Sequence, residues 1–444
     1  MYYQYRSDTK NMNYQKVSES IFLKISLNRL VLLSVFGLIM LVSHLVTLPE
    51  PIMALVASIF MVFMPILLGH DLITFGKKYS LSMFQNLDVI SRLIIFWIIG
   101  SLFIFHLTVF SAALKFNFMV VLLITLFVLL AGSLRENVSF RGIELQDFLN
   151  PQEKNRLDER AHNQKLSMVK KTPSTFFESR SANLCLVVII VAICISSTLF
   201  FRMYQPFPTY MMAEFQHFGK AIQMIDALGN LTIVEKAYFV IIYANQAIAS
   251  SLFNVHPLPI IWVAAFIQSV IVGGGIFAIG MLLFKKIIPS LIAAFLSLWI
   301  LGGAPVQNNP YVFSDGSLSS MFFILTLYLI TKNLQKHGIQ LNKKNLIITF
   351  LLCLGLPASI FIQRLVVWSD STIATLFVPF LPFALILFNR DQLIYGGRYR
   401  FSIILLAAFT FLVMLHPFNA PLYIILSCVY VILWKLLTNG DKRD

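Results

Sequence analysis

Apolar runs about as long as a bilayer is thick recur along the whole chain, and they limit its fold more than any other feature. A helix of about 20 apolar residues crosses a bilayer core, and scanning with that window gives about twelve candidate spans. They lie at 29–48, 51–69, 93–113, 117–134, 184–201, 257–284, 287–303, 316–331, 345–362, 371–388, 401–416 and 419–438. We therefore expect an all-α, polytopic helical membrane protein.

The composition supports this fold class. Of the 444 residues, 58% are hydrophobic and only 12% are charged, whereas soluble proteins contain about 25% charged residues. The formal net charge of +14 could indicate a nucleic-acid partner. In a membrane protein, however, a basic excess usually marks the cytoplasmic loops, so we expect no nucleic-acid partner, and no feature indicates a protein partner.

Most basic residues fall on the cytoplasmic side of the membrane when the N-terminus is placed in the cytoplasm. About 29 of the 34 basic residues then fall on inner segments, in agreement with the positive-inside rule. The few outer ones are Lys115, Arg202, Lys220, Lys236 and Arg364. We therefore predict that both termini are cytoplasmic and that the protein lies in the plasma (inner) membrane, with the excess charge facing anionic lipid.

Two segments leave alternatives open. The run 257–284 contains Gly273-Gly274-Gly275, so we expect it to be tilted or broken there. The run 237–253 is short and includes Asn245 and Gln246. We interpret it as interfacial or re-entrant, because counting it as a span would place Lys285 and Lys286 outside.

The charge distribution divides the chain into four parts. They are a cytoplasmic segment at 1–28, a four-span block at 29–134, a charged inner loop with an amphipathic helix at 135–182, and eight spans at 183–444. The first span lacks a clear cleavage site and is expected to be an anchor. One long outer loop, 202–256, interrupts the last part and is the best place for chemistry.

Glu214 and His217 lie three residues apart in this outer loop, so a helix would place them on one face. A carboxylate beside an imidazole can act as a general base or bind a metal. The alternative is an amphipathic helix on the membrane with its polar residues upward. Asp226 follows in the same loop, and His256-Pro257 closes it; Pro257 can also simply start the next helix.

Further polar residues occupy the later outer loops. Asn308 lies in the loop after the span 287–303, and Asp315 stands at the outer start of the next span. An acid at a helix N-terminus stabilises the helix dipole whatever its function. Arg364, beside Asp370, is one of the few outer cations and suits a bidentate phosphate contact.

From residue 183 to about 400, the order of these features resembles the GT-C superfamily of polyprenyl-phosphate-dependent integral membrane glycosyltransferases. The similar features are the fifth span, the outer loop with Glu214, the His256-Pro257-Leu258 start of the next span, the basic turn Lys285–Lys286, and Ser314-Asp315-Gly316. The chain differs in having Leu258 where the family motif has a second proline, and in carrying the acid after the fifth span rather than the first.

The resemblance implies a hexosyl or pentosyl transfer from a polyprenyl-phosphate donor at the outer face. It gives Glu214 the role of general base or metal ligand, makes His217 its neighbour, and makes Asp315 a second acid. Arg364, Asp226, His256 and Asn308 are then substrate-binding candidates. A metal held by Glu214 and Asp315 would be Mg or Mn, which prefer oxygen ligands.

Two other functions fit the same sequence. One is a transporter or lipid-linked sugar flippase without catalysis, for which a helix unwound at Gly273–Gly275 would provide a midplane site. The other is a cell-surface polysaccharide polymerase or ligase, which would share the outer-loop chemistry.

Overall fold

The computed structural model describes residues 33–46, 49–75, 87–149, 180–204, 219–228, 240–302, 311, 313–337, 372–395, 399–416 and 419–440. Within these ranges the regular elements are α-helices, and none of the described residues belongs to a strand. Side chains in several helix segments are outside the description, namely 134–149, 180–187, 202–204, 240, 302, 315, 336–337, 372–379 and 435–440. The described part of the chain is therefore all-α, as predicted.

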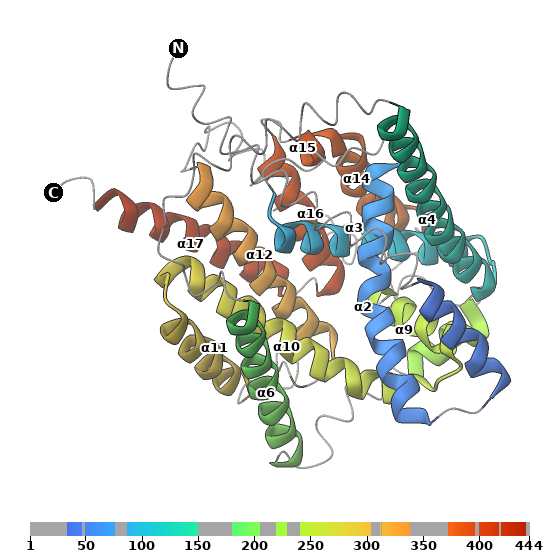
Figure 1. Cartoon of the computed structure of the whole chain (residues 1–444), viewed down its shortest axis with the longest axis horizontal. Helices are drawn as coiled ribbons and strands as arrows, with labels where there is room; N and C mark the ends of the chain where they lie inside the picture. The colour runs from blue at the N-terminus through green and yellow to red at the C-terminus, as the bar shows by residue number, and fades with distance from the viewer. Residues whose placement is uncertain are drawn as a thin grey trace.

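The helices follow the predicted spans closely (Figure 1). They are Leu33–Leu45, α2 (Glu50–Thr74), α3 (Val89–Ala113), α4 (Phe118–Leu149), α6 (Arg180–Tyr204), a helix at 219–228, α9 (Val240–Phe253), α10 (Pro257–Phe284), α11 (Ile287–Gly302), α12 (Asp315–His337), α14 (Thr372–Phe388), α15 (Arg390–Tyr395), α16 (Arg400–Leu415) and α17 (Ala420–Gly440). Each predicted span overlaps one of them, except 345–362, which lies outside the described residues. The amphipathic helix predicted in the inner loop also lies largely outside them.

Four helices are long and apolar enough to cross a membrane by their length and composition. They are Glu50–Thr74, Val89–Ala113, Pro257–Phe284 and Gly316–Gln335. Several shorter apolar helices accompany them, such as Ile287–Leu301 and Ala420–Trp434. These helices have the character of a membrane protein.

The backbones of α2 and α3 touch directly. A Cβ atom added at Gly69 would collide with the carbonyl group of Phe96, and one added at Gly100 would collide with the carbonyl group of Pro65. Small residues allow membrane helices to approach this closely and to gain van der Waals contact along their length. Among the described helices, α2 and α3 form the most extensive pair.

Helix α10 lies at the centre of the second half and is unbroken through its three glycines. Of the two alternatives, tilted or broken, the break is wrong, because the glycines serve packing instead. Gly273 faces Cys194 of α6, and Gly275 faces Ile324 of α12. With 28 residues, α10 is about 42 Å long, and it runs obliquely to α2 in Figure 1.

Helix α9 is buried on all sides. Every residue from 241 to 250 is buried, so α9 packs against other helices on every face. Its 14 residues make a helix about 21 Å long, shorter than a hydrocarbon core of about 30 Å. The interpretation of α9 as interfacial or re-entrant stays a prediction.

Two groups of helix ends can be distinguished. We call the first group the α9 end. There His44 Nε2 lies 3.2 Å from the carbonyl of Leu252, and Ser58 Oγ donates to the carbonyl of Ile260. This brings the end of the first helix, the start of α2 and the α9–α10 turn together. Figure 1 shows these segments around the lower end of α2.

At the second group, the α15 end, the other ends of the same helices meet. Arg390 Nη1 donates to the carbonyl of Leu72 at 3.4 Å, and Gln335 Nε2 donates to the carbonyl of Leu282 at 2.6 Å. The ends of α2, α10 and α12 and the short α15 therefore lie on one side of the protein.

We expect Gly69→Ala to lower the stability, because the new methyl group requires α2 and α3 to separate. Overpacking of this kind costs roughly 1–3 kcal/mol, visible as a lower Tm in detergent. Gly37→Ala is the matched control, since a Cβ there meets no described atom within 4 Å. An equal Tm for both variants would contradict the close contact.

Candidate functional site

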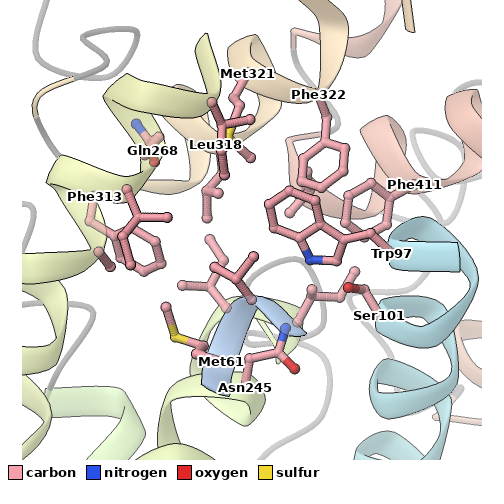
Figure 2. A pocket seen from close by; sticks show the side chains of 17 residues that line it. Met61, Trp97, Ser101, Asn245, Gln268, Phe313, Leu318, Met321, Phe322 and Phe411 are labelled. Atoms are coloured by element: carbon pink, nitrogen blue, oxygen red, sulfur yellow. The ribbon is translucent and has the colours of Figure 1, made fainter. Parts of the chain in front are cut away.

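A cavity of about 40 Å³ lies among α2, α3, α9, α10, α12 and α16. Its walls include Met61, Ala264 and Leu415, and Figure 2 shows side chains from these separate helices converging on it. A cavity of this size holds roughly three water molecules. None of the described residues that line it carries a charge.

Three uncharged polar side chains face this cavity: Ser101 from α3, Asn245 from α9 and Gln268 from α10. They are 1%, 8% and 2% exposed. Within the described residues, Ser101 Oγ and Asn245 Oδ1 have no hydrogen-bond partner. An unpartnered polar atom in an apolar interior is costly, so these atoms are suited to receive a ligand or ordered water.

Aromatic rings form another part of the cavity wall. The rings of Trp97 and Phe322 are 4.7 Å apart, and those of Phe322 and Phe411 are 4.5 Å apart, both in edge arrangements. Figure 2 shows these three rings on one side and Phe313 on the other. Flat rings beside amide and hydroxyl groups can contact the apolar face of an uncharged ligand while the polar groups bind its hydroxyls.

The first turn of α12 forms the edge of the cavity beside Asp315. Phe313 and Leu318, which flank Asp315 in the sequence, both line the cavity. Ser314 and Ser317 cap this helix reciprocally, because each side-chain oxygen accepts from the other residue's backbone N–H, at 3.0 and 3.2 Å. The backbone of Asp315 is therefore fixed at the rim of the cavity, although its side chain is outside the description.

The other predicted site residues fall into two groups. Glu214, His217, Asn308 and Arg364 lie outside the described residues, so their convergence with Asp315 stays a prediction.

Asp226 and His256 are described, and the structure does not bring them into the cavity. The helix at 219–228 buries Ala221, Met224 and Leu228 and exposes Asp226 on its other face. This helix is amphipathic, whereas the amphipathic alternative for Glu214 and His217 concerns residues outside the description. His256 is exposed, and its Nδ1 accepts from the backbone N–H of Leu258 at 3.3 Å, so it caps the start of α10.

A second polar region at the α15 end was not assigned from the sequence. His70 Nδ1 lies 3.3 Å from Asp71 Oδ1, with the two side chains only 11% and 6% exposed. Gly132 of α4 makes room for them, because a Cβ there would collide with the Asp71 carboxylate. Buried ionisable residues in a membrane helix are expensive and usually functional.

Arginines and an acid anchor the helix ends around this region. Arg400 Nη2 donates to the carbonyl of Leu393 at 2.8 Å, and Tyr328 donates to the Asp88 carboxylate at 3.3 Å. Burial, together with the like charge of Arg92, lowers the pKa of Arg400 to about 10. Arg400 therefore remains a cation at neutral pH.

The described residues contain no group of three or more His, Cys, Asp or Glu that could hold a metal ion. The predicted metal ligands Glu214 and Asp315 are not among the described side chains. A metal site therefore remains a prediction for those two residues only.

Trp97, Ser101 and Gln268 are not among the site residues predicted from the sequence. The available signal was the occurrence of polar side chains inside the apolar runs 93–113 and 257–284. A membrane helix tolerates such residues mainly where they face the protein interior.

The chain matches no protein-family model, no curated protein and no solved structure. The site must therefore be judged on its own geometry.

We expect Asn245→Leu to raise the stability, because it removes a buried carbonyl oxygen that has no described partner. Removing such an unpaired group is worth roughly 1–3 kcal/mol, measured as a higher Tm in detergent. Thr410→Val is the matched control: its hydroxyl also has no described partner, but Thr410 does not line the cavity. A lower Tm for Asn245→Leu alone would show that this amide is bonded and structural.

Proposed function

We propose that this protein is a multi-pass membrane glycosyltransferase-like enzyme that transfers a sugar from a polyprenyl-phosphate donor to an acceptor on the extracytoplasmic face. The observation that carries the proposal is the cavity at the first turn of α12. It places uncharged hydrogen-bonding atoms of Ser101 and Asn245 near the ring of Trp97, beside the backbone of Asp315. The cavity can take the hydroxyl groups at one edge of an uncharged sugar, because it has room for roughly three water molecules and no more.

The proposed topology has about twelve spans, with both termini in the cytoplasm of a plasma (inner) membrane. The directions of the described helices support it. The α9 end collects segments predicted to be outside, whereas the α15 end collects the predicted inner segments with Arg92, Lys285, Arg390 and Arg400. The cavity is lined by the middle of α2 and α3 and by the turns of α12 and α16 nearest the α9 end, which favours a reaction on the outer side.

The proposed chemistry uses the two acids predicted from the sequence. The acceptor hydroxyl forms a bond to the anomeric carbon of the donor while the bond from that carbon to the phosphate oxygen breaks. A carboxylate, Glu214 or Asp315, takes the hydroxyl proton, and polyprenyl phosphate leaves with the bonding electron pair. Arg364 would stabilise the charge on the departing phosphate, and Mg or Mn, if bound by Glu214 and Asp315, would do the same.

A flippase or transporter is the second candidate, and one observation favours it. The buried His70–Asp71 pair is of the kind that transporters use for proton or ion coupling. Against this, α10 is continuous through its glycines, whereas many transporters bind substrate at broken helices. A polysaccharide polymerase or ligase would use the same outer site with a different acceptor.

We expect Asp315→Asn to reduce transfer roughly hundredfold or more, because the amide cannot accept a proton from the acceptor. The measurement is sugar transfer from a polyprenyl-phosphate sugar in nanodiscs, or the glycolipid profile of cells. Asp391→Asn is the matched control, because Asp391 is also an acid in the first turn of a helix but lies in α15, at the opposite end of the protein.

Glu214→Gln tests the second acid in the same assay. An unchanged profile with either Asp315→Asn or Glu214→Gln, in cells where deletion of the protein alters it, would remove that residue from the mechanism. Movement of a labelled lipid across vesicles without any sugar transfer would favour the flippase.

A further inference from the structure

The cavity beside Trp97 is too small for a sugar ring but has the size of one sugar substituent. It has room for roughly three water molecules, whereas a pyranose ring with its hydroxyl groups is several times larger. Its walls run from the start of α12, at Phe313 and Leu318, to the middle of α2 and α3, at Met61 and Trp97. A sugar beside the start of α12 would therefore insert only one substituent into the cavity.

Two polar atoms of the cavity wall can bind such a substituent. Asn245 Oδ1 can only accept a hydrogen bond, whereas the Ser101 hydroxyl can donate or accept one. Neither atom has a partner among the described residues. Ser101 thus differs from Thr108 on the same helix, whose hydroxyl donates to the carbonyl of Ile104 one turn earlier at 2.8 Å. The substituent should therefore offer a donor to Asn245 and a second polar atom to Ser101.

The rest of the cavity wall is mainly apolar. Met61 and Leu415 line it, and Figure 2 shows Met61 beside Asn245. An apolar lateral cleft of about 360 Å³ adjoins the cavity at Val62 and Trp97, which line both spaces. A methyl group that displaces weakly held water from such a wall increases affinity. The substituent should therefore carry a methyl group as well as its two polar atoms.

We propose that the cavity binds the acetamido group of an N-acetylated sugar, an inference that rests on the proposed function and specifies its substrate class. The amide N–H of this group would donate to Asn245 Oδ1, and its carbonyl oxygen would accept from the Ser101 hydroxyl. Its methyl group would lie against Met61 and Leu415. The acetyl part has about as many heavy atoms as the cavity has room for water molecules.

Other common sugar substituents match the cavity less well. A hydroxyl or hydroxymethyl group can bond to Asn245 and Ser101, but it leaves part of the cavity and its apolar wall unfilled. A carboxylate has no hydrogen to donate to Asn245 Oδ1. None of the described residues that line the cavity could neutralise its charge, so its burial would be costly. The cavity should therefore select N-acetylated sugars over neutral and acidic ones.

The test compares sugars that differ only in this group. The full-length protein in nanodiscs is titrated with polyprenyl-phosphate-linked N-acetylglucosamine and its glucose counterpart, and with the corresponding pair of galactose configuration. A second arm uses the methyl glycosides of the same sugars, because the N-acetylated sugar can be the donor or the acceptor. We expect the Kd of the N-acetylated member to be lower by on the order of tenfold in one arm, which identifies the source.

Two substitutions in the cavity should reduce this preference. Asn245→Leu should abolish it, because the acceptor is lost, although the same change is expected to raise the Tm and so leaves the protein folded. Ser101→Ala should lower the preference roughly threefold, because one hydrogen-bond donor is lost. Thr410→Val is the matched control and should keep the wild-type preference, since Thr410 also has an unpartnered hydroxyl among the described residues but does not line the cavity.

Equal affinity for the N-acetylated and parent sugars in both arms would overturn the inference. A preference that persists unchanged in Asn245→Leu would also overturn it. Both measurements need binding alone, so they separate the inference from the proposed function. Preferential binding without any sugar transfer would support the acetamido site and contradict the enzyme, whereas sugar transfer with equal affinities would support the enzyme and contradict the site.

Discussion

The direct contact between the backbones of α2 and α3 determines where space remains in this protein. Gly69 and Gly100 allow the two helices to approach until each meets the other's carbonyl groups. This fixes one compact wall, against which α9, α10 and α16 also pack. Because α10 diverges from this wall after its contact at Ser58, a cleft and a cavity remain on the α10 side. The candidate site is thus a consequence of helix crossing geometry and needs no separate domain.

Charged and uncharged polar side chains occupy different parts of the helix bundle. Charged groups such as Arg390 and Arg400 gather at the α15 end, where they reach backbone carbonyl groups. The cavity near the α9 end contains uncharged Ser101, Asn245 and Gln268 instead. An apolar interior tolerates an unpaired hydroxyl or amide far better than an unpaired charge. This difference favours an uncharged ligand over a charged one in the cavity.

Much of the helical framework could be predicted from the sequence, because a bilayer requires long apolar helices whose backbone groups are satisfied internally. The runs 51–69 and 93–113 correspond directly to α2 and α3. The start of α10 at Pro257 was also among the alternatives considered.

The packing could not be predicted in the same way. Helices that are apolar on every side do not reveal which face meets a neighbour, so Trp97 and Gln268 were not recognised as cavity residues. Gly273–Gly275 suggested a break, but glycine in a membrane helix serves close packing as readily as unwinding. The position of the short helix α9 in the membrane could not be predicted, because it depends on helices that are distant in sequence.

The most direct test of the account is the side of the membrane on which each end of the bundle lies. Single cysteines at Asn117, on the α3–α4 turn at the α9 end, and at Lys286, on the α10–α11 turn at the opposite end, can be introduced after replacing the 4 native cysteines. Both positions are exposed. The account predicts that a membrane-impermeant maleimide labels Asn117→Cys in intact cells and labels Lys286→Cys only after permeabilisation. The reverse pattern would place the cavity on the cytoplasmic side and contradict a reaction at the outer face.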